Sequence, residues 1–173
     1  AANCPPPNPR IAAWWRELNR VAENIDEFDL SLETTHHGPW IETPSLFIEI
    51  GSTAETWGHM GAAKLLAGII YRGLGLDGGL GLGNWEGAGR VVVTLGGGHY
   101  APRGNLLASH EDVWIGHMLA TYALPFSKDE NDIVTGMWEN SIRKAISSTK
   151  SAFPGGEVVC SMDKKAFKGW QRQ

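Results

Sequence analysis

Cysteine and long hydrophobic runs are scarce in this sequence. The 173 residues include two cysteines, Cys4 and Cys160, which are too few and too far apart for a disulfide framework or a zinc ribbon. Glycine, proline or a charged residue interrupts each apolar run well before the roughly 20 residues that a membrane-spanning helix needs. The first seven residues also lack the basic start and apolar centre of a signal peptide. We therefore expect reduced thiols, no membrane segment and a cytoplasmic location.

Hydrophobic residues are abundant enough for one substantial core. They make up 42% of the chain, and a chain of this length commonly folds as one unit. Strand-like apolar runs alternate with amphipathic, helix-like stretches, so we expect a single α/β domain over residues 1–173. Helices are expected at residues 9–24, from a capping box at 52–55 to about 72, and from a second capping box at 127–130 to just before Pro154. Strands are expected at residues 28–34, 45–53, 91–95, 112–119 and 157–162.

Glycine is dense between residues 73 and 89. Residues 73–78 match the pattern G-x-G-x-x-G, but a dinucleotide-binding loop must follow a strand and open a helix. Here the pattern follows a predicted helix and precedes more glycine, which excludes a nucleotide site. We expect a flexible connection instead, with Trp85 packing back on the domain.

The strongest candidate for a site follows the apolar run at 91–95. Gly96, Gly97 and Gly98 lack side chains, so a ligand can approach their amides closely. The next residues add polar chemistry, since His99 can move a proton or bind a metal, Tyr100 carries a phenol, and Arg103 can bind a carboxylate or phosphate. Ligands of α/β folds gather at the carboxyl ends of strands. The alternative is a glycine-rich hairpin turn with solvated side chains.

A carboxylate and several histidines are further candidates. Glu49 lies among Phe47, Ile48 and Ile50, and we expect it to be desolvated, either for a functional purpose or in a structural ion pair. The helix predicted to start near Ser52 and Thr53 would direct its amides to the same edge. His36 and His37 either bind a metal or proton or form structural hydrogen bonds, and His117 is either a core residue or a member of the site. His59 and His110 are expected to be solvated.

Charge is polarised along the chain. Residues 1–142 carry 8 basic and 17 acidic side chains, whereas residues 143–173 carry 7 and 2. Four of the basic residues stand beside Phe167 and Trp170, a combination that suits a polyanion such as RNA; they are Lys164, Lys165, Lys168 and Arg172. A solvated helix face would give the same composition.

Four motifs in this order resemble those of the D-aminoacyl-tRNA deacylase of archaea and plants: Thr35-His36-His37-Gly38-Pro39, Phe47-Ile48-Glu49-Ile50-Gly51-Ser52-Thr53, Gly96-Gly97-Gly98-His99-Tyr100-Ala101-Pro102-Arg103 and Gly116-His117-Met118. The resemblance implies a three-layer αβα sandwich with a mixed sheet, of the phosphorylase or peptidyl-tRNA hydrolase-like kind. It also implies a zinc-associated enzyme that cuts the ester joining a D-amino acid, or an aldehyde-modified amino acid, to tRNA. The family usually has a further portion ahead of the region matching residues 5–18, and we expect this chain to lack it.

Ester hydrolysis needs an activated water, donors for the oxyanion and contacts for the nucleic acid. Histidines and carboxylates are also the usual ligands of zinc. We therefore expect an aminoacyl-tRNA substrate, a Zn²⁺ cofactor and a monomer. The expected catalytic residues are Glu49 and His99, and the expected metal ligands are His36, His37 and His117. The expected substrate contacts are Ser52, Thr53, Gly96, Gly97, Gly98, Tyr100 and Arg103, with Lys164, Lys165, Lys168 and Arg172 binding tRNA. A small-molecule metallohydrolase, such as a peptidase or amidase, and a non-catalytic tRNA-binding module are the alternatives.

Overall fold

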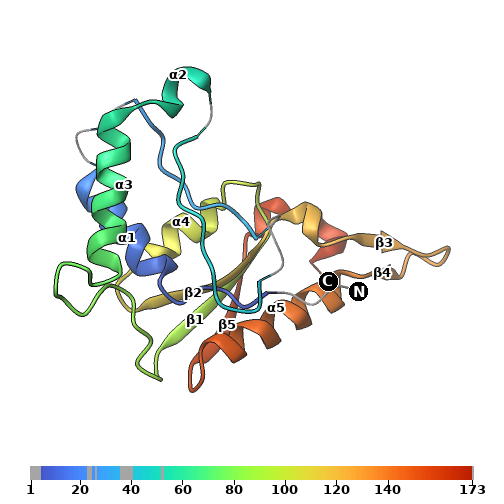
Figure 1. The fold of residues 1–173 in the computed structure, drawn as a ribbon. Helices are drawn as coiled ribbons and strands as arrows, with labels where there is room; N and C mark the ends of the chain where they lie inside the picture. The colour runs from blue at the N-terminus through green and yellow to red at the C-terminus, as the bar shows by residue number, and fades with distance from the viewer. Residues whose placement is uncertain (1–4, 23–24, 26, 36–40, 52, 173) are drawn as a thin grey trace.

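A parallel three-stranded sheet forms the centre of the protein in a computed structural model that describes residues 5–22, 25, 27–35, 41–51 and 53–172 (Figure 1). The strands are β1 (Arg90–Leu95), β2 (Val113–Leu119) and β5 (Glu157–Met162), and they lie in the order β2–β1–β5. Val91 of the central strand pairs with Trp114 on one side and Val158 on the other. β1 and β2 are buried on both faces and have nearly continuous apolar sequences, whereas β5 is more exposed along its length; all three strands were predicted.

Helices cover both faces of this sheet. Successive side chains of a strand point to opposite faces, and the neighbours Val92 and Val93 accordingly belong to two separate cores. Val92 packs with α1 (Ile11–Val21) and α4 (Pro102–Ala108), whereas Val93 packs with α5 (Trp138–Ala152). The fold is thus α/β, with a parallel sheet between helices. Among the described residues, antiparallel pairing occurs in a separate two-stranded sheet, so the mixed character expected of the main sheet is not seen there.

Two predicted strands are extended segments without a strand ladder. Residues 28–34 use their amides elsewhere, because Leu32 N donates to Asn105 Oδ1 at 2.7 Å and Thr34 N donates to the His99 carbonyl at 2.8 Å. Within the described ranges, residues 45–51 form one isolated bridge, between Pro7 and Ser45. The alternating pattern therefore gave the extended backbone correctly but the strand assignment was wrong.

The helix predicted from residue 52 to about 72 is two helices. Thr53 and Thr56 form the capping box of α2 (Ala54–Trp57), which ends at Gly58. His59 then caps α3 (Met60–Gly73), since its Nδ1 accepts a hydrogen bond from Ala62 N at 3.0 Å. The expectation that His59 is solvated is wrong, because its ring is half-buried and lies edge-on to Phe28.

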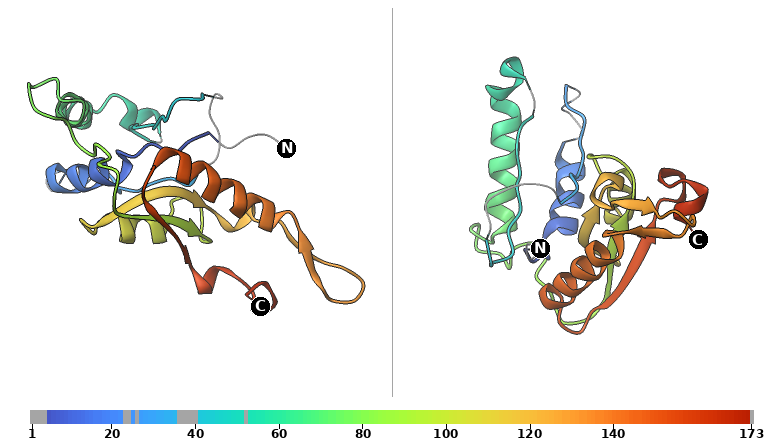
Figure 2. Two further views of the ribbon diagram at one scale, coloured as in Figure 1. Left: turned by 90° about the horizontal axis from the view of Figure 1, so that it is seen from below. Right: turned by 90° about the vertical axis from the view of Figure 1, so that its right-hand side faces the viewer.

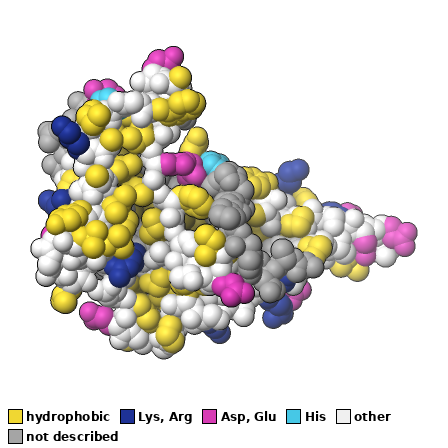
Figure 3. Space-filling view, in the orientation of Figure 1, with side chains coloured by type: hydrophobic (Ala, Val, Ile, Leu, Met, Phe, Trp, Pro, Cys, Tyr) yellow, Lys and Arg dark blue, Asp and Glu magenta, His cyan; other side chains and the backbone are white. Residues whose placement is uncertain are grey.

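The second predicted capping box is instead part of a β-hairpin. Strands β3 (Phe126–Lys128) and β4 (Val134–Gly136) pair antiparallel, and the hydroxyls of Ser127 and Thr135 lie 2.9 Å apart across them. Asp129 closes the turn by accepting hydrogen bonds from Asn131 N and Ile133 N. The hairpin projects from the domain, and acidic side chains lie at its tip (Figures 1 and 3). Helix α5 therefore begins later than predicted, at Trp138.

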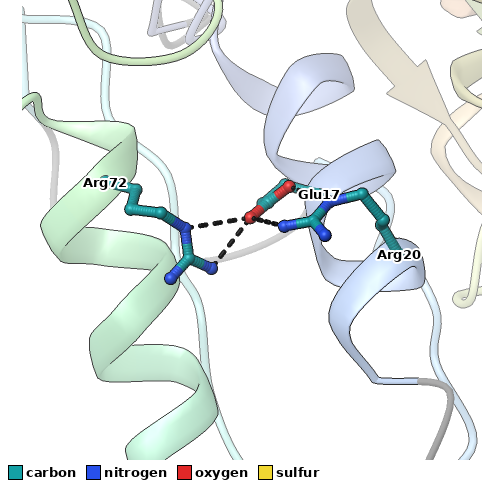
Figure 4. Close-up of polar contacts among 3 residues, drawn as sticks. All are labelled: Glu17, Arg20 and Arg72. Atoms are coloured by element: carbon teal, nitrogen blue, oxygen red, sulfur yellow. Dashed lines mark hydrogen bonds and ion pairs between the residues drawn. The ribbon is translucent and has the colours of Figure 1, made fainter. Parts of the chain in front are cut away.

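Helix α3 rests on α1 and lies on the far side of α1 from the sheet (Figure 2). A Cβ atom on Gly73 would lie 2.5 Å from the ring of Trp14, so the two helices touch closely there. Glu17 of α1 also accepts hydrogen bonds from Arg72 of α3 and from Arg20 (Figure 4). Hydrophobic side chains gather over the α3 region in Figure 3, in keeping with the exposure of Tyr71 and Leu74. None of the helices within the described ranges is long and apolar enough to cross a membrane.

The glycine-rich residues 73–89 run as a series of turns against the start of α1. Arg10 donates to the carbonyls of Gly73 and Leu82 at 2.9 and 2.8 Å and to Asn84 Oδ1 at 2.6 Å. Trp85 packs edge-on against Trp114 and Phe153, and its Nε1 donates to the Pro154 carbonyl at 2.9 Å. The predicted packing of Trp85 against the domain is confirmed.

Candidate functional site

The glycines after β1 turn the chain sharply at the carboxyl edge of the sheet. Gly96 and Gly97 have φ angles of 95° and 86°, a region that only glycine enters without strain. The Gly96 amide donates to the Leu119 carbonyl at 2.8 Å, so this amide is not available to a substrate oxyanion while that bond is made. The Gly97 carbonyl accepts from the amide and hydroxyl of Thr121 at 3.0 and 3.2 Å. The turn thereby joins the ends of β1 and β2.

His99 follows this turn and contacts residues from two other segments. Its Nε2 lies 3.3 Å from Glu33 Oε1, and its Nδ1 lies 3.4 Å from the hydroxyl of Tyr122. The Tyr122 hydroxyl in turn lies 3.3 Å from Thr34 Oγ1. A carboxylate, an imidazole, a phenol and a hydroxyl therefore meet at the predicted edge of the sheet, although they come from residues far apart in the sequence.

Arg103 lies on the first turn of α4 and contacts the end of β5. The helix begins after Ala101, which is buried in a left-handed conformation with φ 40° and ψ 55°. Arg103 Nε donates to Ser161 Oγ at 2.9 Å, which fixes the half-buried guanidinium near the end of β5. Tyr100 is exposed and meets the His99 ring edge-on, with ring centroids 5.1 Å apart. His99 and Tyr100 thus contact each other, whereas Arg103 contacts Ser161 of β5.

His117 lies near the carboxyl end of β2, and its side chain is buried. It is 2% exposed, its Nδ1 lies 3.1 Å from Thr35 Oγ1, and its amide donates to Thr149 Oγ1 at 3.4 Å. Burial lowers the pKa of His117 to about 4, although a hydrogen bond with the Pro5 carbonyl acts in the opposite direction. The imidazole is therefore neutral at physiological pH and joins the N-terminal segment, Thr35 and β2.

Glu49 and Thr53 lie outside the sheet strands, on the extended segment 45–51 and at the start of α2. Glu49 is exposed on the extended segment 45–51, so the expectation that its carboxylate is desolvated is wrong. Among the described residues, no strand pairs with this segment, which leaves Glu49 open to solvent. Thr53 is the N-cap of α2, which lies well apart from the sheet in the views of Figures 1 and 2.

Three predicted site residues, His36, His37 and Ser52, lie outside the described residues. Among the residues that are described, no group of three or more His, Cys, Asp and Glu side chains could hold a metal ion. Those residues alone therefore do not form a zinc site.

The basic residues of the C-terminal tail are exposed: Lys164, Lys165, Lys168 and Arg172. Lys164 and Lys165 lie on the 3₁₀ turn η2 (Lys164–Ala166), whereas Lys168 and Arg172 flank the 3₁₀ turn η3 (Gly169–Gln171). Phe167, between the two turns, is extended. Phe167 is a core residue, and its ring leaves no room for a Cβ on Gly96. Trp170 packs edge-on against Phe126 beneath the ammonium group of Lys128, which lies 5.5 Å from the ring centre.

Sequence reasoning did not identify Glu33, Thr34 or Tyr122 as members of the site. Tyr122 belongs to the short 3₁₀ turn η1 (Thr121–Ala123), which follows the carboxyl end of β2. The rule that located His99 after β1 applies equally to residues after β2, so that signal was present for Tyr122. Glu33 and Thr34 lie in a segment whose path over the sheet edge no local pattern indicates.

Known proteins were compared with this chain. The model of the family described as D-aminoacyl-tRNA deacylase matches residues 1–173. D-aminoacyl-tRNA deacylase of Arabidopsis thaliana is 42% identical over 96% of this chain and 57% of its own length. The Pyrococcus abyssi deacylase is 42% identical over 56% of this chain and 34% of its own length.

The comparison with solved structures gives the same fold. The crystal structure of AF0625, a conserved protein of unknown function, superposes with a TM-score of 0.69 and 26% sequence identity. The match covers 98% of this chain and 52% of that chain. This chain spans a little over half the length of the plant relative. Because the family model covers the whole chain, the protein belongs to the D-aminoacyl-tRNA deacylase family.

Proposed function

We propose that this chain hydrolyses the ester between a D-amino acid, or an aldehyde-modified amino acid, and tRNA. The observation that carries the proposal is the His99 imidazole held between Glu33 and Tyr122 at the carboxyl edge of the sheet. Family membership supplies the substrate class, since the relatives that match are D-aminoacyl-tRNA deacylases. His99 is the acid–base group of the reaction, because an imidazole exchanges protons readily near neutral pH.

The surroundings of His99 suit the other requirements of ester hydrolysis. The amides of Gly97 and Gly98 are the candidates for stabilising the tetrahedral oxyanion, since the Gly96 amide is bonded to Leu119. Arg103, oriented by Ser161, is the candidate for a phosphate or a substrate carboxylate. The exposed tail lysines and Arg172 bind the more distant phosphates of tRNA.

The remaining predicted site residues also have roles in the proposed reaction. Glu49 is proposed as a second catalytic carboxylate that contacts the substrate from the exposed segment 45–51. Tyr100, Ser52 and Thr53 are proposed as substrate contacts. We also propose that the whole family member has a three-layer peptidyl-tRNA hydrolase-like fold and acts as a cytoplasmic monomer.

Zinc is a separate part of the proposal. The described residues do not fit a zinc ion by themselves, and His117 is buried with hydrogen bonds to Thr35 and Pro5. A zinc site would need His36 and His37, so no step of the reaction is assigned to the metal. Metal analysis of the purified protein, before and after chelation, tests this part; full activity of metal-free protein would remove zinc from the mechanism.

The main test is a deacylation assay with a D-aminoacyl-tRNA and its L counterpart. We expect hydrolysis of the D-ester to be faster, and His99→Asn to lower the rate by about a hundredfold or more. His110→Asn is the matched control, because His110 is exposed beyond α4 and outside the site. Binding of tRNA without turnover by the unmodified protein would contradict the proposal and indicate a tRNA-binding module. Hydrolysis of small esters or amides with no preference for tRNA would indicate a small-molecule hydrolase.

A further inference from the structure

The hydrogen bonds around His99 have a defined direction. The Glu33 carboxylate can only accept, so the neutral imidazole carries its hydrogen on Nε2, which lies 3.3 Å away. Nδ1 is then an acceptor, and the hydroxyl of Tyr122 at 3.4 Å donates to it. The Tyr122 oxygen in turn accepts from the Thr34 hydroxyl at 3.3 Å. In this series of hydrogen bonds, from Thr34 through Tyr122 and His99 to Glu33, each donor thus has an acceptor.

Tyr122 is the most exposed of these hydrogen-bonded residues. The residue is 64% exposed, whereas the side chains of His99 and Glu33 are 38% and 36% exposed. Both ring nitrogens of His99 are also occupied, one by Glu33 and the other by Tyr122. A substrate oxygen arriving at this edge therefore meets the phenol rather than a vacant imidazole nitrogen.

The position of Tyr122 is fixed by backbone contacts on both sides of the site. Thr121, its neighbour, donates two hydrogen bonds to the Gly97 carbonyl, from its amide and its hydroxyl. The amide of Thr34 is bonded to the His99 carbonyl at 2.8 Å. Tyr122 and His99 are consequently held by the same glycine turn, which is the kind of preorganisation that proton transfer requires.

We propose that Tyr122 is a catalytic residue through which His99 exchanges protons with the substrate. This inference rests on the proposed deacylase function and deepens it. In the attack step, the water oxygen bonds to the ester carbonyl carbon while the water gives one proton to the Tyr122 oxygen. Tyr122 passes its own proton to His99 Nδ1, and Glu33 faces the resulting imidazolium.

The collapse step returns the same proton. The bond between the carbonyl carbon and the ribose oxygen breaks, the ribose oxygen takes a proton from Tyr122, and Tyr122 regains one from His99 Nδ1. The products are the amino acid and the free ribose hydroxyl of tRNA, and the acid loses its remaining proton to water. The three residues end in their starting protonation states, so no further reactant is required.

Single-turnover hydrolysis of D-aminoacyl-tRNA by Tyr122→Phe tests the inference, with Tyr71→Phe as the matched control on the exposed surface of α3. We expect Tyr122→Phe to lower the rate constant by about a hundredfold, without weakening tRNA binding, and Tyr71→Phe to leave it unchanged. Adding Tyr122→Phe to His99→Asn should cause little further loss, because residues that act as one unit are not additive.

A measurement without turnover tests the contact itself. In protein with ¹⁵N-labelled histidine, we expect the Nδ1 resonance of His99 to shift in Tyr122→Phe and not in Tyr71→Phe. If the unmodified protein cleaves the ester and Tyr122→Phe cleaves it equally fast, or the resonance is unchanged, the inference is overturned while the proposed function stands. If the unmodified protein does not cleave the ester, the proposed function fails, and the catalytic role of Tyr122 fails with it.

Discussion

Gly116 of β2 faces Thr149 of α5 at a separation that leaves no space for a side chain. A Cβ atom on Gly116 would lie 2.5 Å from Thr149 Cγ2 and 2.7 Å from Thr149 Oγ1. Thr149 is fully buried, and its hydroxyl accepts the His117 amide. Helix α5 therefore packs directly against β2 at this point, immediately next to His117.

Gly116→Ala should destabilise the fold. The added methyl group must displace a buried threonine with no route to solvent, which we expect to lower the free energy of unfolding by about 1–3 kcal/mol. Urea denaturation measures this, with Gly58→Ala as the control, because a Cβ on Gly58 would contact nothing within 4 Å. Equal stability of the two variants would show that α5 can move away from β2 at little cost.

Glu17→Gln should loosen the attachment of α3 to α1. The Glu17 side chain is 12% exposed, and Arg72 Nη2 lies 2.8 Å from its Oε1 (Figure 4). We expect a loss of about 1.5–3 kcal/mol at pH 7, the range for hydrogen bonds to charged groups. Glu139→Gln, which breaks an exposed pair with Arg143 on α5, should cost far less.

The stabilisation by Glu17 should also depend on pH. Hydrogen bonding by Arg20, followed by Arg72 and the charges of both, lowers the pKa of Glu17 below its ordinary value of 4.5. A lowered carboxyl pKa gives stabilisation that is complete above pH 4.5 and is lost as the pH falls through the folded-state value. The difference between wild type and Glu17→Gln should therefore shrink as the pH falls below 4.5 and through the lowered folded-state pKa. A constant difference over this range would contradict the assignment.

His117 should make the protein less stable in mild acid. Its pKa is lowered from 6.5 to about 4. Between these two pH values, His117 is therefore protonated in the unfolded chain and neutral in the folded chain. Stability should accordingly be complete above pH 6.5 and fall by on the order of 3 kcal/mol as the pH decreases to 4. His117→Asn should flatten this dependence, whereas His110→Asn should not. An unaltered slope in His117→Asn would show that other groups dominate.

Removing the tail lysines should separate tRNA binding from the chemistry. Changing Lys164, Lys165 and Lys168 to Ala should weaken tRNA binding and reduce the log–log salt slope by up to about three units. Hydrolysis of a minimal D-aminoacyl-adenosine ester should be unchanged, because it lacks the distant phosphates. The control, with the same charge removed, changes Lys64, Lys144 and Lys150 to Ala. Equal salt slopes for the two triple variants would place the RNA elsewhere.

The sequence predicted the elements whose signal is local. The run Val91 to Val93 was predicted as a buried strand, and the helix predicted at residues 9–24 from its amphipathic periodicity contains α1, which spans Ile11–Val21. The hairpin at Phe126 to Gly136 was misread because Ser127 and Glu130 match a helix-capping pattern, whereas cross-strand pairing decided the structure. A short motif cannot reveal which partner its backbone will find.

The location of the candidate site was predicted from the sequence, but several of the residues that form it were not. His99 and Arg103 follow a recognisable strand and a glycine turn, so position along the chain was sufficient to place them. The contacts of His99 with Glu33 and Tyr122 depend on how three distant segments cross one edge, which no spacing encodes. Glu49 shows the opposite failure, since its apolar neighbours suggested burial, but no strand in the described part of the chain pairs with its segment.

The three hydrogen bonds of Arg10 have a consequence for how the glycine-rich loop can be altered. By holding Gly73 at one end and Leu82 and Asn84 at the other, the guanidinium keeps the two ends of the loop together independently of the chain between them. Leu80 at the tip is 92% exposed. The tip is thus a natural place to insert a foreign peptide, or to open the chain as new termini, without disturbing the strand that follows.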